Sequence, residues 1–272
     1  MLCRCGQQFN FRYVQNIVKP PAIVLIVGSA THTSIEKNLR SKMETKVLLP
    51  DEAVRQAAAD DVNRRWQDEG ADLSSLDEDE VGKGEKELRG EAVDMAVSLA
   101  SLHGRELAPG IEPIHLERKW DVAIISGTCD LQGTIDVEER GRIRDTKTRK
   151  ASPPKGVADR DEQLTMYAMA SAVLAKEEDA RAGGSKALSE FIPELTMDFL
   201  VKTKTPKTVI QTTHREQKDF SPLLARIAAA SKCIESGMFM PCPPDSWQCS
   251  PRYCGWFNQC EFVRHKVSVA VP

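Results

Sequence analysis

Two carboxylates and a lysine lie close together in residues 133–148, which read GTIDVEERGRIRDTKT. Side chains on a β-strand alternate between its two faces, so Asp145 and Lys147, two residues apart, point to the same face. Asp136 ends the preceding strand of a predicted hairpin, and strand pairing brings its carboxylate near that of Asp145. Carboxylate oxygens bind hard divalent ions such as Mg²⁺, and a neighbouring ammonium suits an activated water or a phosphate oxygen.

The hairpin is indicated by a short apolar pattern and by a polar Glu-Glu-Arg-Gly turn at residues 138–141. The apolar members are Ile135, Val137 and Ile143. A second interpretation stays open from these residues alone, because charged amphipathic hairpins with one solvated face are common.

Five ordered motifs run along the chain: Gly28-x-x-x-His32, Gly133-x-x-Asp136, Asp145-x-Lys147-Thr148, Gln163-x-x-x-Tyr167, and a set of cysteines near both ends. Together they resemble the PD-(D/E)XK nuclease superfamily. The set looks most like the RecB-type branch, which includes phage exonucleases and the CRISPR-adaptation nucleases, and like its iron–sulfur members. The resemblance extends from about Cys5 to Cys260 but leaves out residues 40–110. It implies an α/β fold, a restriction-endonuclease-like core with a mixed central sheet flanked by helices, plus a helical insert.

The resemblance also implies metal-dependent hydrolysis of DNA phosphodiesters. The implied ligands of one or two Mg²⁺ or Mn²⁺ ions are His32, Asp136, Asp145 and the backbone carbonyl of Thr146. The implied catalytic residues are Asp136, Asp145, Lys147, Gln163 and Tyr167. The lysine would position the nucleophile or stabilise charge in the transition state, while Gln163 and Tyr167 would orient the lysine and contact the DNA strand.

Blander interpretations of the same residues remain. His32 and Glu36 share one face of a helix that we expect to begin at Gly28, and a lone helical histidine is usually a structural hydrogen-bonding group. Without the resemblance, Tyr167 is a core residue and Gln163 a surface residue. Glu117 precedes the hairpin on the neighbouring strand. We interpret it as an exposed strand residue, with a place beside the metal as the alternative.

Charge is unevenly distributed along the chain. The formal net charge is −3, but residues 51–94 carry 15 acidic and 6 basic side chains, so the remainder is basic. Residues 140–160 are rich in lysine and arginine, which is the expected footprint of binding to a phosphate backbone. The candidate DNA-binding residues are Arg140, Arg142, Arg149, Lys150 and Lys155. The alternative is a solvated charged surface.

The chain of 272 residues, 41% of them hydrophobic, can bury one sizeable core. No apolar run reaches the roughly 20 residues that span a bilayer. The apolar run at residues 20–28 also lacks the layout of a signal peptide, so we expect no membrane partner and a cytoplasmic location. With the resemblance, that location is a bacterial or phage-infected cell. The eight cysteines are then reduced or metal-bound.

Cysteines near the carboxyl end are separated by four and five residues, which misses the usual zinc pattern of paired close cysteines. The spacing resembles the cluster signature of phage RecB-like nucleases, with Trp256 and Phe257 shielding the sulfurs. The implied ligands of a [4Fe–4S] cluster are Cys5, Cys249, Cys254 and Cys260. Zinc is the second alternative, and disulfides are the third. Cys3, Cys233 and Cys242 have no counterpart in the family, and Cys129 is expected to pack in or near the sheet.

Four parts are expected in the chain: a cluster and metal-ligand segment at 1–39, a helical insert at 40–112, the nuclease core at 113–238 and a cysteine segment at 239–272. The insert is acidic, so it either faces away from DNA or gates access to the site. The family usually has a short segment before the first cysteine, which predicts a start upstream of Met1.

The function expected from the sequence is a metal-dependent DNA nuclease, an exonuclease acting on free ends in DNA recombination, repair or phage DNA processing. An alternative from another class is a catalytically silent DNA-binding or scaffold protein that kept the fold and the cluster. The complete catalytic set argues against that alternative, since a binding protein has no use for it.

Overall fold

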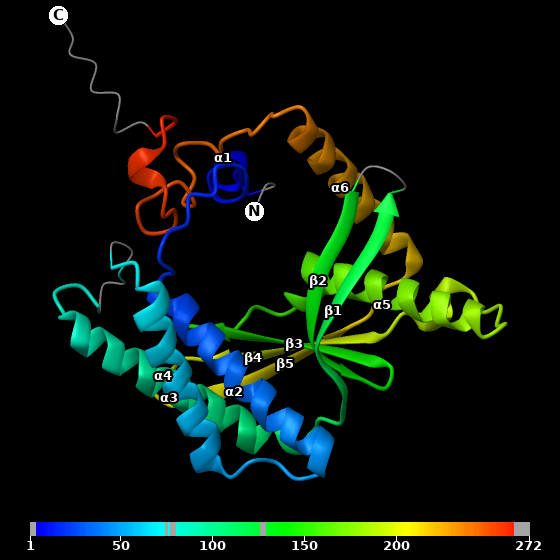
Figure 1. Ribbon diagram of the computed structural model, residues 1–272, viewed down its shortest axis with the longest axis horizontal. Helices are drawn as coiled ribbons and strands as arrows, with labels where there is room; N and C mark the ends of the chain where they lie inside the picture. The colour runs from blue at the N-terminus through cyan, green and yellow to red at the C-terminus, as the bar shows by residue number, and fades with distance from the viewer. Residues whose placement is uncertain (1–3, 74–75, 77–79, 126–128, 264–272) are drawn as a thin grey trace, which may run out of the picture.

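The structure is a computed structural model that describes residues 4–73, 76, 80–125 and 129–263 (Figure 1). Its centre is a five-stranded sheet in the order β1-β2-β3-β4-β5. The strands are Pro113–Ile125, Cys129–Glu139, Arg142–Arg149, Glu194–Val201 and Lys207–Thr213. All neighbours are antiparallel except β3 and β4, which are parallel. The α/β fold with a mixed, helix-flanked sheet is therefore confirmed.

Helices flank the sheet in two groups, each with its own apolar core (Figure 1). The helices are α1 (Gly6–Phe9), α2 (Ile23–Thr45), α3 (Asp51–Glu69), α4 (Glu85–Glu106), α5 (Glu162–Arg181) and α6 (Phe220–Glu235). A π-helical turn covers Asn10–Val14, and short 3₁₀ turns cover Ala108–Gly110, Ala158–Arg160, Leu188–Phe191, Gln217–Asp219 and Phe257–Gln259. The helical segment expected within residues 40–112 contains α3 and α4, and the predicted hairpin is formed by β2 and β3.

The α2–α4 group shares one core with the sheet. Residues of all three helices pack in one cluster with Leu116 of β1, Val137 of β2 and Leu200 of β4. The acidic helical segment therefore covers one side of the nuclease sheet. A second cluster joins α5 and α6 to Ile143 and Phe199.

Helix α2 begins at Ile23, so Gly28 lies inside it and the expected helix start at Gly28 is wrong. The reason is burial: Ile23, Ile26, Val27 and Ala30 recur at helical spacing and are all buried. This packing overrides the strand propensity of a β-branched run.

The β2–β3 turn is shorter than predicted. Glu138 and Glu139 belong to β2, and only Arg140 and Gly141 form the turn. Gly141 has a φ of 78°, which favours glycine in a two-residue hairpin loop. Glu138 stays in the strand because its carboxylate accepts a hydrogen bond from Arg118 of β1 (2.8 Å).

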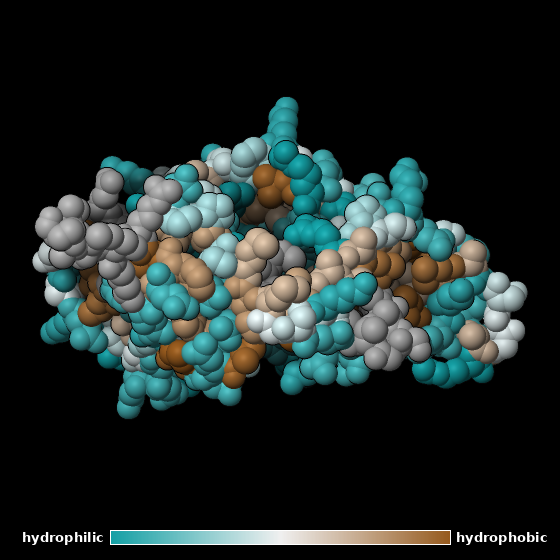
Figure 2. Space-filling view, turned by 90° about the horizontal axis from the view of Figure 1, so that it is seen from above, coloured by the Kyte–Doolittle hydropathy of each residue, from teal (hydrophilic) through white to brown (hydrophobic). Residues whose placement is uncertain are grey.

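Both ends of the described chain meet beside this sheet (Figure 1). We call residues 4–19 and 238–263 the terminal module. Its two parts are joined by hydrogen bonds from Gly6 N–H to the Met240 carbonyl (2.7 Å) and from Gln7 Nε2 to the Phe239 carbonyl (2.7 Å). Seen from the side of this module and α6, apolar side chains form separate patches among hydrophilic ones (Figure 2). Among the described helices, none is long and apolar enough to cross a membrane.

Candidate active site

A pocket of about 630 Å³ opens beside the first half of α2, where β2 and β3 separate. Its polar lining comes from five elements. These residues include His32 of α2, Arg65 of α3, Glu117 of β1, Asp136 of β2, and Thr146 and Lys147 of β3. Residues from distant parts of the sequence therefore converge on one side of the sheet.

Asp136 lies at the place where the β2–β3 ladder opens. The last backbone pair before it joins Val137 to Arg144. Beyond that pair, Asp136 Oδ2 accepts a hydrogen bond from the Thr146 N–H (3.3 Å), and His32 Nδ1 lies 3.3 Å from the same oxygen. The carboxylate thus joins α2 to β3 at the mouth of the opening.

Lys147 is held between two acceptors on different elements. Its Nζ donates to Asp145 Oδ1 (3.0 Å) and to Gln163 Oε1 (2.9 Å), and Gln163 Nε2 donates to the Tyr167 hydroxyl. Alternation on β3 and the four-residue spacing on α5 account for these neighbours. Tyr167 is also buried in the core, so its ring is fixed by packing.

Burial and mutual repulsion set the electrostatics of the pair of carboxylates. Burial raises the pKa of Asp145, and the charge of Asp136 raises it further. Burial lowers the pKa of His32, but the hydrogen bond and charge of Asp136 outweigh it, so the pKa is raised overall. The site between these acids therefore attracts additional positive charge, either a proton or a cation.

Buried contacts behind the pocket hold β3 and α5 in place. Arg144 makes a two-pronged ion pair with Asp198 of β4, Nε to Oδ2 and Nη2 to Oδ1, both at 2.8 Å. Asp161 caps α5 by accepting from the Leu164 N–H (2.9 Å). Buried Arg215 donates to Thr165 and to loop carbonyls before α5. The two partners of Lys147, Asp145 on β3 and Gln163 on α5, therefore belong to elements that are fixed by buried contacts.

Two further residues line the pocket, one of them, Glu117, in agreement with the alternative given for it from the sequence. Glu117 is half-buried and lines the pocket, so its interpretation as an exposed strand residue is wrong. Burial, followed by the charges of Asp136 and Glu36, raises the pKa of Glu117 to about 7. Arg65 of α3 also reaches the pocket while pairing with Asp61 (2.6 Å). Neither a strand glutamate nor one arginine in a charged helix carries a local signal for these contacts, which depend on how β1 and α3 pack.

The profile of the PD-(D/E)XK nuclease superfamily matches residues 1–261. The chain belongs to this superfamily. A crystal structure from Eubacterium rectale, titled "Putative exonuclease", has a similar fold, with a TM-score of 0.50 and 12% sequence identity. The match covers 98% of this chain and 83% of the other. No curated protein matches the sequence.

A divalent ion, which PD-(D/E)XK nucleases use, fits the chemistry of this pocket. Asp145 Oδ2 is buried and lies 2.9 Å from Lys147 Nζ, yet it accepts no well-directed hydrogen bond from the described residues. As placed, no three His, Cys, Asp or Glu side chains in the described ranges converge closely enough to hold a metal. Asp136 instead contacts His32, and Asp145 contacts Lys147. Small side-chain shifts are needed to turn these acids toward one ion.

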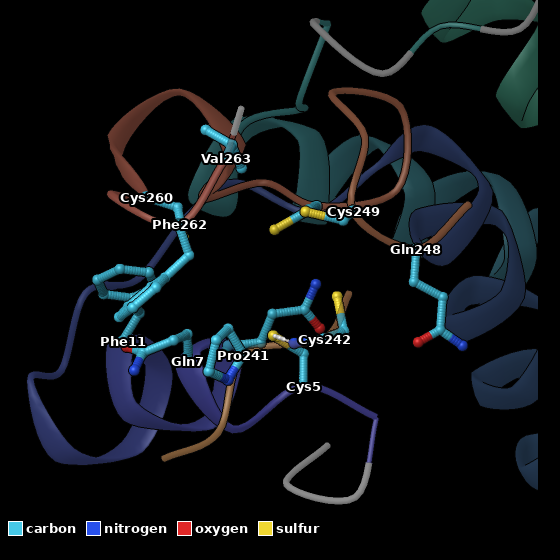
Figure 3. Close-up of a pocket in the computed structure, with 12 residues that line it drawn as sticks. Cys5, Gln7, Phe11, Pro241, Cys242, Gln248, Cys249, Cys260, Phe262 and Val263 are labelled. Carbon is cyan, nitrogen blue, oxygen red and sulfur yellow. Dashed lines mark hydrogen bonds between the residues drawn. The ribbon is translucent and has the colours of Figure 1, made fainter. Parts of the chain in front are cut away.

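Five thiols line a second, smaller cavity in the terminal module (Figure 3). They belong to Cys5, Cys242, Cys249, Cys254 and Cys260. The Cys242 N–H donates to Cys5 Sγ (3.4 Å), although these residues are 237 positions apart. All five are free thiols. Cys242, expected to have no counterpart, is thus part of the group.

Apolar side chains cover the thiols, but not the ones predicted. Phe11, Pro241, Phe262 and Val263 line the cavity (Figure 3), while Trp256 stacks behind Phe11 with its ring centre 6.5 Å away. Cys3 lies outside the described residues, and so does the side chain of Cys129. Cys233 on α6 does not line the cavity.

The five cysteine sulfurs are donors of the kind that ligate zinc or an iron–sulfur cluster. Burial raises the pKa of Cys249 and of Cys260, and burial together with the Cys5 charge raises that of Cys242 to about 12. Several thiolates cannot persist together without a cation, so these thiols are protonated in the absence of a metal. The cavity that they line measures about 10 Å³, so a cluster requires the lining to rearrange.

The basic run does not form one patch. Arg140 and Arg142 lie at the hairpin turn beside Glu112, and Arg142 donates to Glu194 (2.5 Å). Arg149 lies at the other end of β3, roughly 23 Å away for seven strand residues. Lys150 and Lys155 are exposed beyond it. The DNA-binding role of these five residues stays a prediction.

Proposed function

We propose that the protein is a Mg²⁺- or Mn²⁺-dependent deoxyribonuclease of RecB type that hydrolyses phosphodiester bonds from free DNA ends. The observation that carries the proposal is the hydrogen-bonded chain Asp145–Lys147–Gln163–Tyr167 beside the Asp136–His32 pair. It supplies the acids and the cation of a phosphodiester hydrolase at one pocket, with the orienting groups directly behind Lys147. Membership of the superfamily supports the same reaction class.

In this proposal each residue has a separate task. His32, Asp136, Asp145 and the Thr146 carbonyl hold the ion. When bound, a divalent ion supplies a Lewis acid for the scissile phosphate and lowers the pKa of water. Lys147 positions the attacking water or places its charge beside the phosphoryl oxygens as negative charge develops.

Gln163 and Tyr167 orient Lys147 rather than titrate. The amide oxygen of Gln163 fixes the ammonium in the direction of Asp145, and the amide nitrogen is itself fixed by the phenol oxygen. Burial raises the pKa of Tyr167, and the charges of Asp136 and Asp145 raise it further. The phenol therefore stays neutral and can donate a hydrogen bond to the DNA strand.

One assay tests the proposal. The purified protein is incubated with Mg²⁺ or Mn²⁺ and with end-labelled linear or covalently closed DNA, each single- and double-stranded. We expect linear DNA to be degraded from its ends, with closed circles resistant. Cleavage of circles at the rate of linear DNA would replace the exonuclease by an endonuclease. No cleavage of any substrate would contradict the nuclease proposal itself.

We further propose that Cys5, Cys249, Cys254 and Cys260 ligate a structural [4Fe–4S] cluster, with zinc as the alternative. Convergence of thiols from both ends of the chain supports a metal group. Four thiolates satisfy the ligand count of such a cluster. The Cys242 N–H, which points at Cys5 Sγ, would then donate to a ligating sulfur and lower its negative charge.

A further inference from the structure

A groove of about 800 Å³ runs between the terminal module and the helices α2 and α3. One wall is made by residues 4–19 and 252–256, and the other by the amino end of α2 and the carboxyl end of α3. It is separate from the thiol cavity, which lies on the inside of the module. None of the proposed catalytic residues lines it.

Partly exposed aromatic rings line this groove. One side of Tyr13 packs against Phe9, with the ring centres 5.0 Å apart, and the Arg252 guanidinium lies over the Tyr253 ring at 5.4 Å, so each tyrosine offers its remaining exposed surface. Tyr13 is 58% exposed and Tyr253 is 47% exposed, although both are large rings that burial favours. Trp256 also lines the groove and is held in place because its Nε1 donates to the Ile17 carbonyl (3.1 Å). Exposed rings on a fixed backbone are the stacking surfaces that unpaired bases use.

The groove also carries positive charge. Its basic side chains are Arg4, Arg12, Lys19 and Arg252. Three acidic residues also line it. Asp68 and Glu69 on the α3 wall each contact an arginine of their own helix, at 3.6 and 3.3 Å, and Asp72 lies just beyond α3. Within the described part of the chain, Arg12 and Lys19 make no ion pair with a carboxylate. Both can therefore contact phosphates.

Helix α2 links the groove to the active-site pocket. Leu25 lines both spaces, and His32 follows it by seven residues, so both side chains lie on one side of the helix. Two helical turns separate them, about 10 Å along the axis. A strand that leaves the groove past Leu25 meets His32 next.

We propose that this groove binds single-stranded DNA and leads it along α2 into the active-site pocket. The destination of the strand rests on the proposed nuclease function, whereas the binding itself does not. The bases stack on Tyr13 and Tyr253, and the backbone contacts Arg12 and Lys19. Duplex DNA is a poorer occupant because its bases are already stacked on each other and their faces are closed.

Binding is measured by fluorescence anisotropy of labelled oligo(dT) on the full chain in EDTA, so that cleavage plays no part. Tyr13→Ala is expected to weaken binding about 5-fold or more, whereas Tyr13→Phe, which keeps the ring, binds like the wild type. Arg12→Ala and Lys19→Ala should each reduce the slope of log K against log salt by about 0.7. Lys218→Ala, an exposed lysine outside the groove, is the matched control.

Cross-linking tests the contact directly, including the case in which Tyr13→Ala disturbs the module. Ultraviolet irradiation with an oligonucleotide containing 5-iododeoxyuridine should give adducts at Tyr13, Tyr253 or Trp256. The groove proposal would be overturned if adducts formed only at other residues and if Arg12→Ala and Lys19→Ala bound DNA with unchanged affinity. Equal affinity for duplex DNA would overturn the single-strand preference.

The two proposals fail separately. Lys147→Ala should bind oligo(dT) like the wild type, since it lies outside the groove. A protein that binds through the groove but never cleaves DNA contradicts the nuclease proposal and keeps the groove. If Tyr13→Ala and Arg12→Ala leave both cleavage and affinity unchanged, the groove proposal is contradicted and the nuclease proposal is kept.

Discussion

Lys147 has the most closely specified surroundings in the pocket. Its ammonium contacts a buried carboxylate on its own strand and an amide on α5, and each partner is fixed in turn by a further contact. A half-exposed lysine normally loses side-chain entropy when it is held in one position. Here the buried charge of Asp145 offsets that cost, so the cation stays aimed at the acids.

Substituting either member of this pair should abolish cleavage while leaving binding intact. Asp145→Asn removes a metal ligand, and Lys147→Ala removes the charge that faces the phosphate. We expect cleavage to fall about 100-fold or more in each case. The measurement is the single-turnover rate on linear DNA, with oligo(dT) affinity in EDTA as the control. A wild-type rate for Asp145→Asn would show that the metal assignment is wrong.

Glu117→Gln tests the third acid of the pocket. The substitution keeps the shape but removes a charge that faces Asp136, so the pocket attracts cations less. We expect the Mg²⁺ concentration for half-maximal cleavage to rise about 5-fold or more, as for the loss of about 1 kcal/mol, with a smaller change at saturating metal. Glu112→Gln, an exposed acid paired with Lys42, is the control. An unchanged Mg²⁺ titration would show that Glu117 has no role in metal binding.

Helix α4 carries a buried polar group that its packing leaves unsatisfied. Neither ring nitrogen of His103 has a hydrogen-bond partner in the described structure. Burial lowers its pKa to about 3, and the charge of Arg144 adds to this effect. The side chain therefore stays neutral in the folded protein at a pH where the unfolded chain binds a proton.

This difference predicts acid sensitivity. Above pH 6.5, the ordinary pKa of histidine, His103 is neutral in both states and does not make the free energy of unfolding depend on pH. Below pH 6.5 the unfolded state binds a proton that the folded state does not. Its share of the free energy of unfolding then falls by about 1.4 kcal/mol per pH unit until about pH 3. In urea unfolding at pH 7, 6 and 5, His103→Leu should gain on the wild type as pH falls. Parallel curves would contradict this, and His115→Leu on the exposed side of β1 is the matched histidine control.

At the scale of the whole molecule, the two ends of the chain are joined through few contacts. The two parts of the terminal module are held together by a few hydrogen bonds, such as those of Gly6, Gln7 and Trp256, by aromatic contacts and by the packing of the five thiols. Closing a loop of more than 200 residues is entropically costly, and a shared metal group would restrict the unfolded chain accordingly.

Loss of one cluster ligand should therefore release the module. We expect Cys254→Ser to lose the brown colour and the iron content of about four per chain. Its free energy of unfolding should fall by roughly 5 kcal/mol, and its activity should be lost as well. Anaerobic purification, iron and zinc analysis and thermal unfolding measure these. Cys233→Ser on α6 should change none of them. A colourless protein with one zinc would replace the cluster but keep the link, and full stability without metal would remove both.

Local patterns were sufficient for much of the site. Alternation along β3 places Asp145 beside Lys147, and the helical period places Gln163 beside Tyr167, because each pair depends on a single element. Alternation of apolar residues likewise indicated the hairpin that forms β2 and β3. The superfamily could be predicted because these motifs occur in a fixed order along the chain.

Contacts between elements were decided only by the tertiary structure. The start of α2 depends on burial of Ile23 and Ile26 against other helices, which outweighs local propensity. Glu117 enters the pocket because β1 pairs with β2, and Cys242 joins the other thiols because residues 238–263 pack on α1. No period in the sequence encodes such distances, since they are set by how separate apolar faces bury one another.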